Sequence, residues 1–117
     1  MGHVSGAGER MTSVLSAIAA DARRTNLARV QQIGAALRRA AGKGLDAEGW
    51  AAVERTAHQL AGSAGTFGFA GVSERARYLE RFCAEAMLIA PDERALAAAQ
   101  RVLDQASHQL ADDPVLD

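Results

Sequence analysis

Few residues in this sequence have side chains that could carry out a reaction, and one histidine stands out among them. His58 lies in a segment whose apolar positions recur every three or four residues, the period of a helix face. At about 100° per residue, the His58 side chain points roughly 135° away from this apolar stripe and therefore into solvent. A neutral imidazole is a nucleophile near pH 7, and a phosphorylated ring nitrogen passes its phosphoryl group on readily.

Two glycines follow the histidine within the same segment. Gly62 lies one helical turn after His58, and Gly65 lies nearly two turns after it. Each glycine in a helix interior costs about 1 kcal/mol relative to alanine, so an ordinary surface helix has no reason to carry both. Positions without side chains let another protein's backbone or a bulky group approach the ring. The pattern indicates a site for a reaction between proteins rather than a closed catalytic pocket.

The sequence lacks the other residue sets that catalysis or metal binding would need. It has no glycine-rich phosphate loop with its lysine, no histidine pair or Glu-x-x-His pair at metal spacing, and no recognisable serine or carboxylate partner for His58. A single cysteine, Cys83, excludes an internal disulfide and a cysteine-based metal site. We therefore expect no cofactor, no metal and no enzymatic activity of the chain's own, and we expect a carrier.

The segments that must position His58 are all predicted to be helices. Five segments show helical periodicity, and no segment shows the period-two alternation of a strand. They are residues 9–22, 27–40, 46–67, 72–86 and 91–112. Asn26 is a suitable N-cap for the second segment and Asp46 for the third. The glycines at 42 and 44 are suited to end the second.

Five helices with short links, four of them long enough to pack, predict an all-α fold, an up-and-down four-helix bundle with an additional N-terminal helix. We expect one domain over residues 9–112. The segment 1–8 is expected to be disordered or a remnant of cloning, and residues 113–117 a C-terminal tail. Periodicity leaves open whether the N-terminal helix folds onto the bundle or pairs two chains, and we expect a monomer.

Charge and hydropathy exclude several kinds of partner. The 13 basic and 14 acidic residues give a formal net charge of −1, which provides no basic surface for nucleic acid or an anionic membrane. No apolar run approaches the roughly 20 residues that a membrane span needs, and the first residues lack the apolar centre of a signal peptide. We expect a soluble, cytoplasmic domain.

The residues around the histidine resemble a known family. Residues 57–69 read AHQLAGSAGTFGF, and Leu79-Glu80 follow in the next helical segment. This run is similar to the histidine-containing phosphotransfer (Hpt) domain family, and most similar to the phosphotransfer domains of chemotaxis kinases. The resemblance extends from about residue 27 to 110, with its specific part at 57–80. It implies a phosphocarrier domain of a His-Asp phosphorelay in which His58 accepts the phosphoryl group on Nε2.

The same resemblance assigns roles to the neighbours of His58. Gly62 gives the partner room, while Gly65, Gly68 and Phe69 shape the end of the helix and the turn after it. Independently of the resemblance, Gln59 and Ser63 flank the site by their position, where they either bond the imidazole or phosphoryl group or are ordinary helix-surface residues. The implied partners are a histidine kinase and the receiver domain of a response regulator, whose aspartate and bound Mg²⁺ supply the transfer chemistry.

One position departs from the family pattern. Three residues after the histidine, where the family usually has a lysine, this chain has Ala61. Three interpretations stay open: the domain works without that cation, Arg55 substitutes for it, or phosphotransfer has been lost. In the last case the chain is a non-phosphorylated helical docking module for a receiver or kinase domain. A further alternative is a substrate domain of a larger kinase, phosphorylated from ATP by that kinase's catalytic domain.

Overall fold

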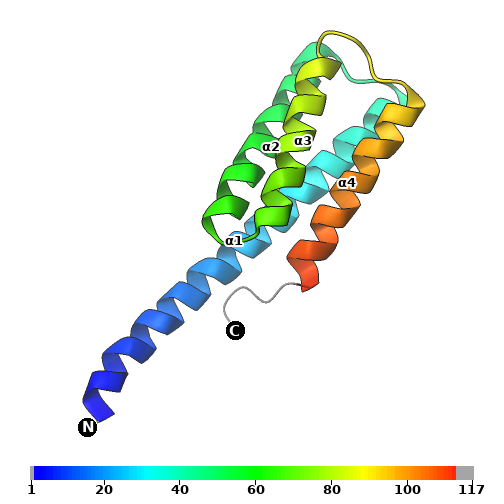
Figure 1. The fold of residues 1–117 in the computed structure, drawn as a ribbon. Helices are drawn as coiled ribbons and strands as arrows, with labels where there is room; N and C mark the ends of the chain where they lie inside the picture. Colours follow the sequence, from blue (N-terminus) through cyan, green and yellow to red (C-terminus); the bar gives the residue numbers. More distant parts are fainter. Residues whose placement is uncertain (1, 113–117) are drawn as a thin grey trace.

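The computed structural model describes the backbone of residues 2–112 and the side chains of residues 8–111. This part of the chain forms four helices and no strand. They are α1 (Gly2–Gly42), α2 (Ala47–Thr66), α3 (Ala70–Ala86) and α4 (Glu93–Asp112). Successive helices run in opposite directions around a shared core (Figure 1). The predicted all-α, up-and-down four-helix bundle is therefore confirmed.

The predicted break between two N-terminal helices is wrong, because α1 runs without interruption from Gly2 to Gly42. Asn26, predicted to cap a second helix, is fully buried inside α1. Its amide nitrogen donates to Ser63 Oγ at 3.1 Å, and its amide oxygen accepts from the Arg29 guanidinium at 2.8 Å. With these partners the side chain does not compete with the helical backbone. The additional N-terminal helix is thus the first part of α1.

α1 is about twice as long as the helices it packs against, with 41 residues against 17 to 20. At 1.5 Å per residue it spans about 60 Å, so its N-terminal part projects beyond the bundle (Figure 1). Residues 2–8 form the start of this helix, whereas the segment 1–8 was expected from the sequence to be disordered or a remnant of cloning. Met1 and the predicted tail 113–117 lie outside the described residues.

Short connections with local caps hold the helices of the bundle in place. Asp46 caps α2 as predicted, because its Oδ1 accepts a hydrogen bond from the Gly49 backbone N–H at 2.7 Å. Asp92 accepts one from the Ala95 N–H at 2.8 Å, at the start of α4. Gly44, between α1 and α2, has φ +86°, a left-handed conformation that costs glycine little.

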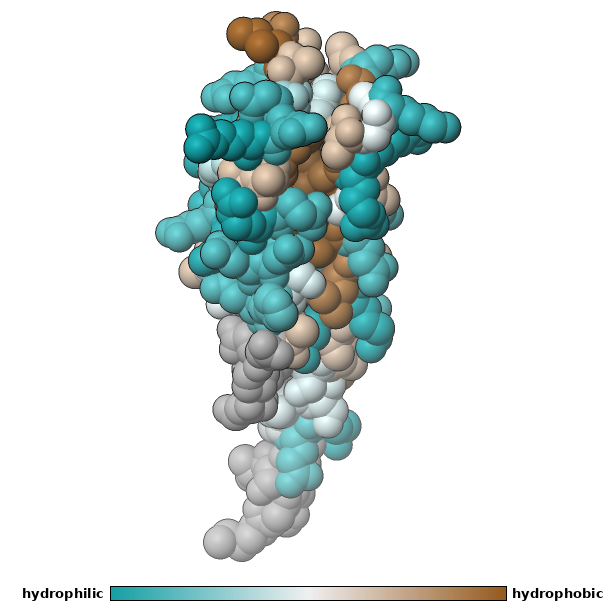
Figure 2. Space-filling model, turned by 90° about the vertical axis from the view of Figure 1, so that its right-hand side faces the viewer, coloured by the Kyte–Doolittle hydropathy of each residue, from teal (hydrophilic) through white to brown (hydrophobic). Residues whose placement is uncertain are grey.

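The core consists of apolar side chains from all four helices. Its largest fully buried members include Ile33, Leu60, Leu79, Leu103 and Leu110. Hydrophilic side chains cover most of the face in Figure 2, and a narrow hydrophobic strip runs between them. Leu88 and Ile89, in the connection from α3 to α4, are strongly exposed. Within the described residues, no helix is both long and apolar enough to cross a membrane.

Candidate functional site

His58 lies on the side of α2 that faces away from the core. The buried residues of α2 are Trp50, Val53, Ala57, Leu60, Ala61 and Ala64. The His58 side chain is 75% exposed, which confirms the direction predicted from the helical phase. Because α2 is packed along one side and capped at Asp46, the imidazole is presented from a rigid element rather than from a loop.

Glu80 of α3 fixes the proton arrangement of the ring. Its Oε2 lies 2.9 Å from His58 Nδ1, and its side chain is 31% exposed. An ionised carboxylate only accepts hydrogen bonds, so this bond requires the proton on Nδ1. In the neutral ring the lone pair is then on Nε2. The pair leaves Nε2 as the nitrogen that is available to a reactant.

The two glycines of α2 have different surroundings. A Cβ built on Gly62 would meet nothing within 4 Å, so the space beside His58 is open here. A Cβ on Gly65 would lie 3.3 Å from Ser73 Oγ of α3. That hydroxyl donates to the Ala61 carbonyl oxygen at 2.8 Å. Gly65 therefore allows α2 and α3 to approach closely, whereas Gly62 borders open space.

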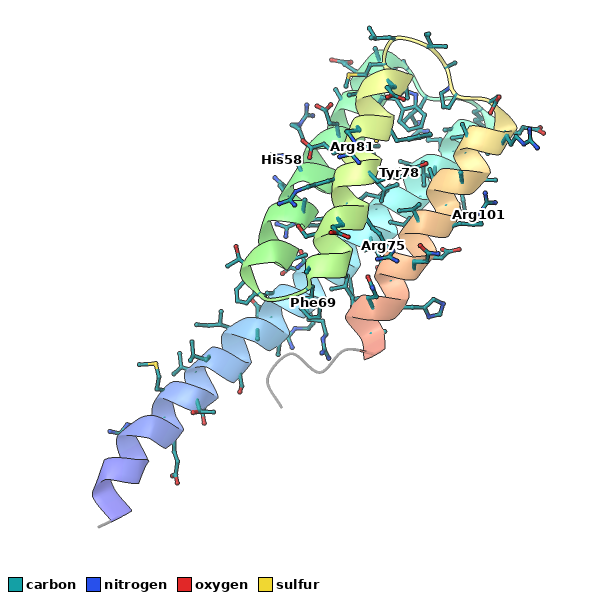
Figure 3. The ribbon with its side chains drawn as sticks, viewed as in Figure 1. His58, Phe69, Arg75, Tyr78, Arg81 and Arg101 are labelled. Carbon is teal, nitrogen blue, oxygen red and sulfur yellow. The ribbon has the colours of Figure 1, made fainter. Side chains whose placement is uncertain are left out.

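Charged side chains from both helices surround His58. A shallow hollow of about 410 Å³ has the imidazole in its wall. Its other lining residues are Glu54, Ala61 and Gly62 of α2 and Arg77, Glu80, Arg81 and Ala84 of α3. Figure 3 shows His58 and Arg81 on these two adjacent helices. Two carboxylates and two guanidinium groups line the hollow, so the formal charges of these four side chains cancel.

The buried thiol of Cys83 lies behind this surface and is not a reactive group. Burial raises its pKa from the ordinary value of 9.0 to about 12, and the carboxylates of Glu54 and Glu80 add to the rise. The thiolate is the reactive form of cysteine, so Cys83 stays protonated and inert near neutral pH. Among the described side chains, no group of three His, Cys, Asp or Glu residues is placed to bind a metal ion.

The likeness of this chain to known proteins is at the level of a family. A family model for the Hpt domain matches residues 14–112, which include α2, α3, α4 and the larger part of α1. The chain belongs to the Hpt domain family. Hpt domains are phosphocarrier modules of phosphorelays and are generally not enzymes. No curated protein and no solved structure gave a match.

The residues predicted to support the site of this Hpt domain do not all gather at His58. Ala61 and Gly62 line the hollow, whereas Arg55 and Gln59 are exposed on α2 and do not. Gly68 lies after the end of α2 with φ +86°. The N–H of Phe69 donates to the Ala64 carbonyl at 2.8 Å and closes the turn, and its ring is buried in the core.

Sequence reasoning found no carboxylate partner for His58, and the structure corrects this with Glu80. It also did not single out Arg77 and Arg81. A signal for all three was present, because Arg77, Glu80 and Arg81 stand at i, i+3 and i+4 and so share one face of α3. Their proximity to the histidine depends on how α2 and α3 pack, which the periodicity of a single helix does not specify.

Proposed function

We propose that this domain is a phosphocarrier that accepts a phosphoryl group on His58 Nε2 and passes it to the aspartate of a receiver domain. One observation carries the proposal: an imidazole that is 75% exposed has its Nδ1 held at 2.9 Å by a carboxylate. This arrangement combines access for a protein partner with a free nucleophilic nitrogen. Membership of the Hpt domain family supports it.

In the bond-making step of the proposed reaction, the imidazole is the nucleophile and Glu80 holds its Nδ1 proton. The Nε2 lone pair attacks the phosphorus of an aspartyl phosphate, the N–P bond forms as the P–O bond breaks, and the aspartate leaves with the electron pair. The Nδ1 proton stays on the ring, so the phosphorylated imidazole is cationic and Glu80 stabilises it. The reverse sequence returns the group to an aspartate.

The partners complete the proposed function. A receiver domain brings the aspartate, and its bound Mg²⁺ stabilises the charge of the transferring group. A histidine kinase is the proposed original donor. We also propose a cytoplasmic location, because phosphoryl groups derived from ATP are supplied there.

The test is intact-mass analysis of the wild type and His58→Gln after incubation with a small-molecule phosphodonor or a phosphorylated receiver. We expect the wild type to gain one acid-labile phosphoryl group and His58→Gln to gain none. The exposed side chain contributes little to the fold, so circular dichroism should show both proteins equally helical. Equal labelling of the two proteins would mean that another residue accepts the group.

Ala61 favours a second candidate, a docking module that binds a receiver or kinase domain without carrying phosphate, because the usual lysine is missing. Under this alternative the folded wild type takes up no phosphate from any of several phosphorylated receivers. It still binds them, and His58→Gln binds equally well. Labelling of the wild type alone excludes the docking module.

A further inference from the structure

The face of α3 that meets the His58 hollow carries two arginines. Arg77 and Arg81 stand one helical turn apart on this face, with Glu80 between them in sequence. Both are exposed and line the hollow together with His58. In the described part of the chain, neither forms a hydrogen bond or an ion pair with another side chain. Their guanidinium groups are therefore available to a ligand at the ring.

We propose that Arg77 and Arg81 form the phosphoryl-binding subsite of His58, in place of the lysine that Hpt domains usually carry at the position of Ala61. The proposal rests on the carrier function proposed above. It assigns the cation to α3 rather than to α2. Arg55, the candidate that the sequence offered on α2, does not line the hollow.

The charges of the hollow show why a cation is needed. A phosphoryl group on His58 brings about two negative charges to a ring that already contacts the Glu80 carboxylate. Glu54 adds a second carboxylate to the same hollow. Without the arginines, the other charged side chains that line the hollow, Glu54 and Glu80, would have the same sign of charge as the phosphoryl oxygens. Guanidinium groups bind phosphoryl oxygens through paired N–H donors, so the two arginines supply both charge and geometry.

A lysine at position 61 would place its positive charge in the same hollow as the two arginines of α3. Ala61 lines this hollow, although it is only 4% exposed between α2 and α3. Long basic side chains lay their aliphatic stem along an apolar surface and hold the charged end in water. A lysine at 61 would therefore bring its ammonium into the hollow that Arg77 and Arg81 line. The two arrangements are interchangeable, and this can be tested.

The experiment measures the rate at which intact protein gains a phosphoryl group from phosphoramidate, and the rate at which it loses the group to a receiver. The variants are Arg77→Gln/Arg81→Gln, the same pair combined with Ala61→Lys, and Arg55→Gln. Arg101→Gln is the matched control, because Arg101 is an exposed arginine of α4 outside the hollow (Figure 3). Arg77→Lys/Arg81→Lys keeps the charge and tests whether charge alone suffices.

We expect Arg77→Gln/Arg81→Gln to gain phosphate about ten-fold more slowly, less than the roughly hundred-fold loss typical of a donor in a water-excluded site, because the hollow is open to solvent. Ala61→Lys in the double variant should restore most of the rate, and Arg101→Gln should match the wild type. All the changed positions except 61 are exposed, and the lysine at 61 extends into the solvent-open hollow, so circular dichroism should show every variant folded.

The outcomes separate this proposal from the carrier function. If the wild type is labelled and the double variant is labelled equally fast, the subsite is wrong and the carrier stands. The double variant could also be labelled slowly with no recovery of the rate on adding Ala61→Lys, and with an equally slow rate in Arg77→Lys/Arg81→Lys. That result would assign the arginines another role and would also overturn the subsite. A loss in Arg55→Gln with none in the double variant moves the cation to α2. If the wild type takes up no phosphate, both the proposed carrier function and the proposed subsite are wrong.

Discussion

The carboxylate of Glu80 decides what the exposed imidazole can do. A histidine on a helix surface exchanges freely between two tautomers, and each nitrogen is then a nucleophile for part of the time. At 2.9 Å, Glu80 holds the proton on Nδ1, which keeps the lone pair on Nε2. The exposure of His58 could be predicted from the helical phase of α2. Its pairing with Glu80, 22 residues away, could not, because it depends on the register between α2 and α3.

Removing this bond should slow phosphotransfer without preventing it. We expect Glu80→Ala to lower the rate about ten-fold, the equivalent of about 1.4 kcal/mol and near the upper range for a net hydrogen bond. Glu80→Gln keeps an acceptor but loses the charge that stabilises the phosphorylated ring, so its rate should lie between wild type and Glu80→Ala. Nitrogen NMR of the imidazole should show Nδ1–H in the wild type and mixed tautomers in Glu80→Ala. An unchanged rate in Glu80→Ala would show that the carboxylate does not position the ring.

The contact between α2 and α3 is the element on which the site is built. Ser73 Oγ donates to the Ala61 carbonyl, and Gly65 lets α3 come close at this level. A Cβ built on Gly62, three residues earlier in α2, would meet no atom within 4 Å, so the space beside this position is open. From the sequence, both glycines were predicted to be positions without side chains beside the imidazole ring. Periodicity shows only the face on which each glycine lies, whereas packing decides which one borders a neighbouring helix.

Gly62 therefore offers a test that separates stability from access. Gly62→Ala should raise the free energy of unfolding by about 1 kcal/mol, because alanine is the better helix former and its methyl group meets no neighbour. Gly62→Leu should stabilise the helix to a similar extent but place a large side chain beside His58. We expect it to slow transfer to a receiver far more than labelling by a small phosphodonor. Urea unfolding and the two rate assays measure these effects; receiver transfer at the wild-type rate in Gly62→Leu would show that no partner uses this space.

Helix ends were predicted best where a cap acts locally, and worst where a long-range contact replaces it. Asp46 caps α2 through the N–H three residues ahead, a pattern visible in the sequence. Asn26 belongs to the same class of capping residue, yet it lies buried within α1 and bonds Ser63, 37 residues away. The sequence contained the right residue type for a cap, but the partner that changes its role becomes adjacent only in the folded bundle.

Over the whole molecule, the bundle and the projecting part of α1 differ in how they are stabilised. Residues of α1 such as Ile33 and Leu37 are almost completely buried among the other helices. The projecting part instead exposes an apolar stripe at helical spacing, with about half of each side chain accessible. Its members are Met11, Val14, Leu15 and Ile18. A helix without tertiary packing is only marginally stable in water, so α1 joins a stable segment to a weak one.

Hydrogen exchange should reveal this division along one continuous helix. We expect backbone amides at 9–18 to exchange near their unfolded rates, while those around Ile33 and Leu37 are protected about a thousand-fold or more, as a cooperatively folded bundle requires. For the monomer that the sequence predicts, protection at 9–18 does not change with protein concentration. Protection that rises with concentration and disappears in Ile18→Glu would mean instead that a second copy covers the stripe. Comparing the two segments at low and high protein concentration therefore tests both the local stability of the projecting part of α1 and the oligomeric state. The protected amides of the bundle are the internal control.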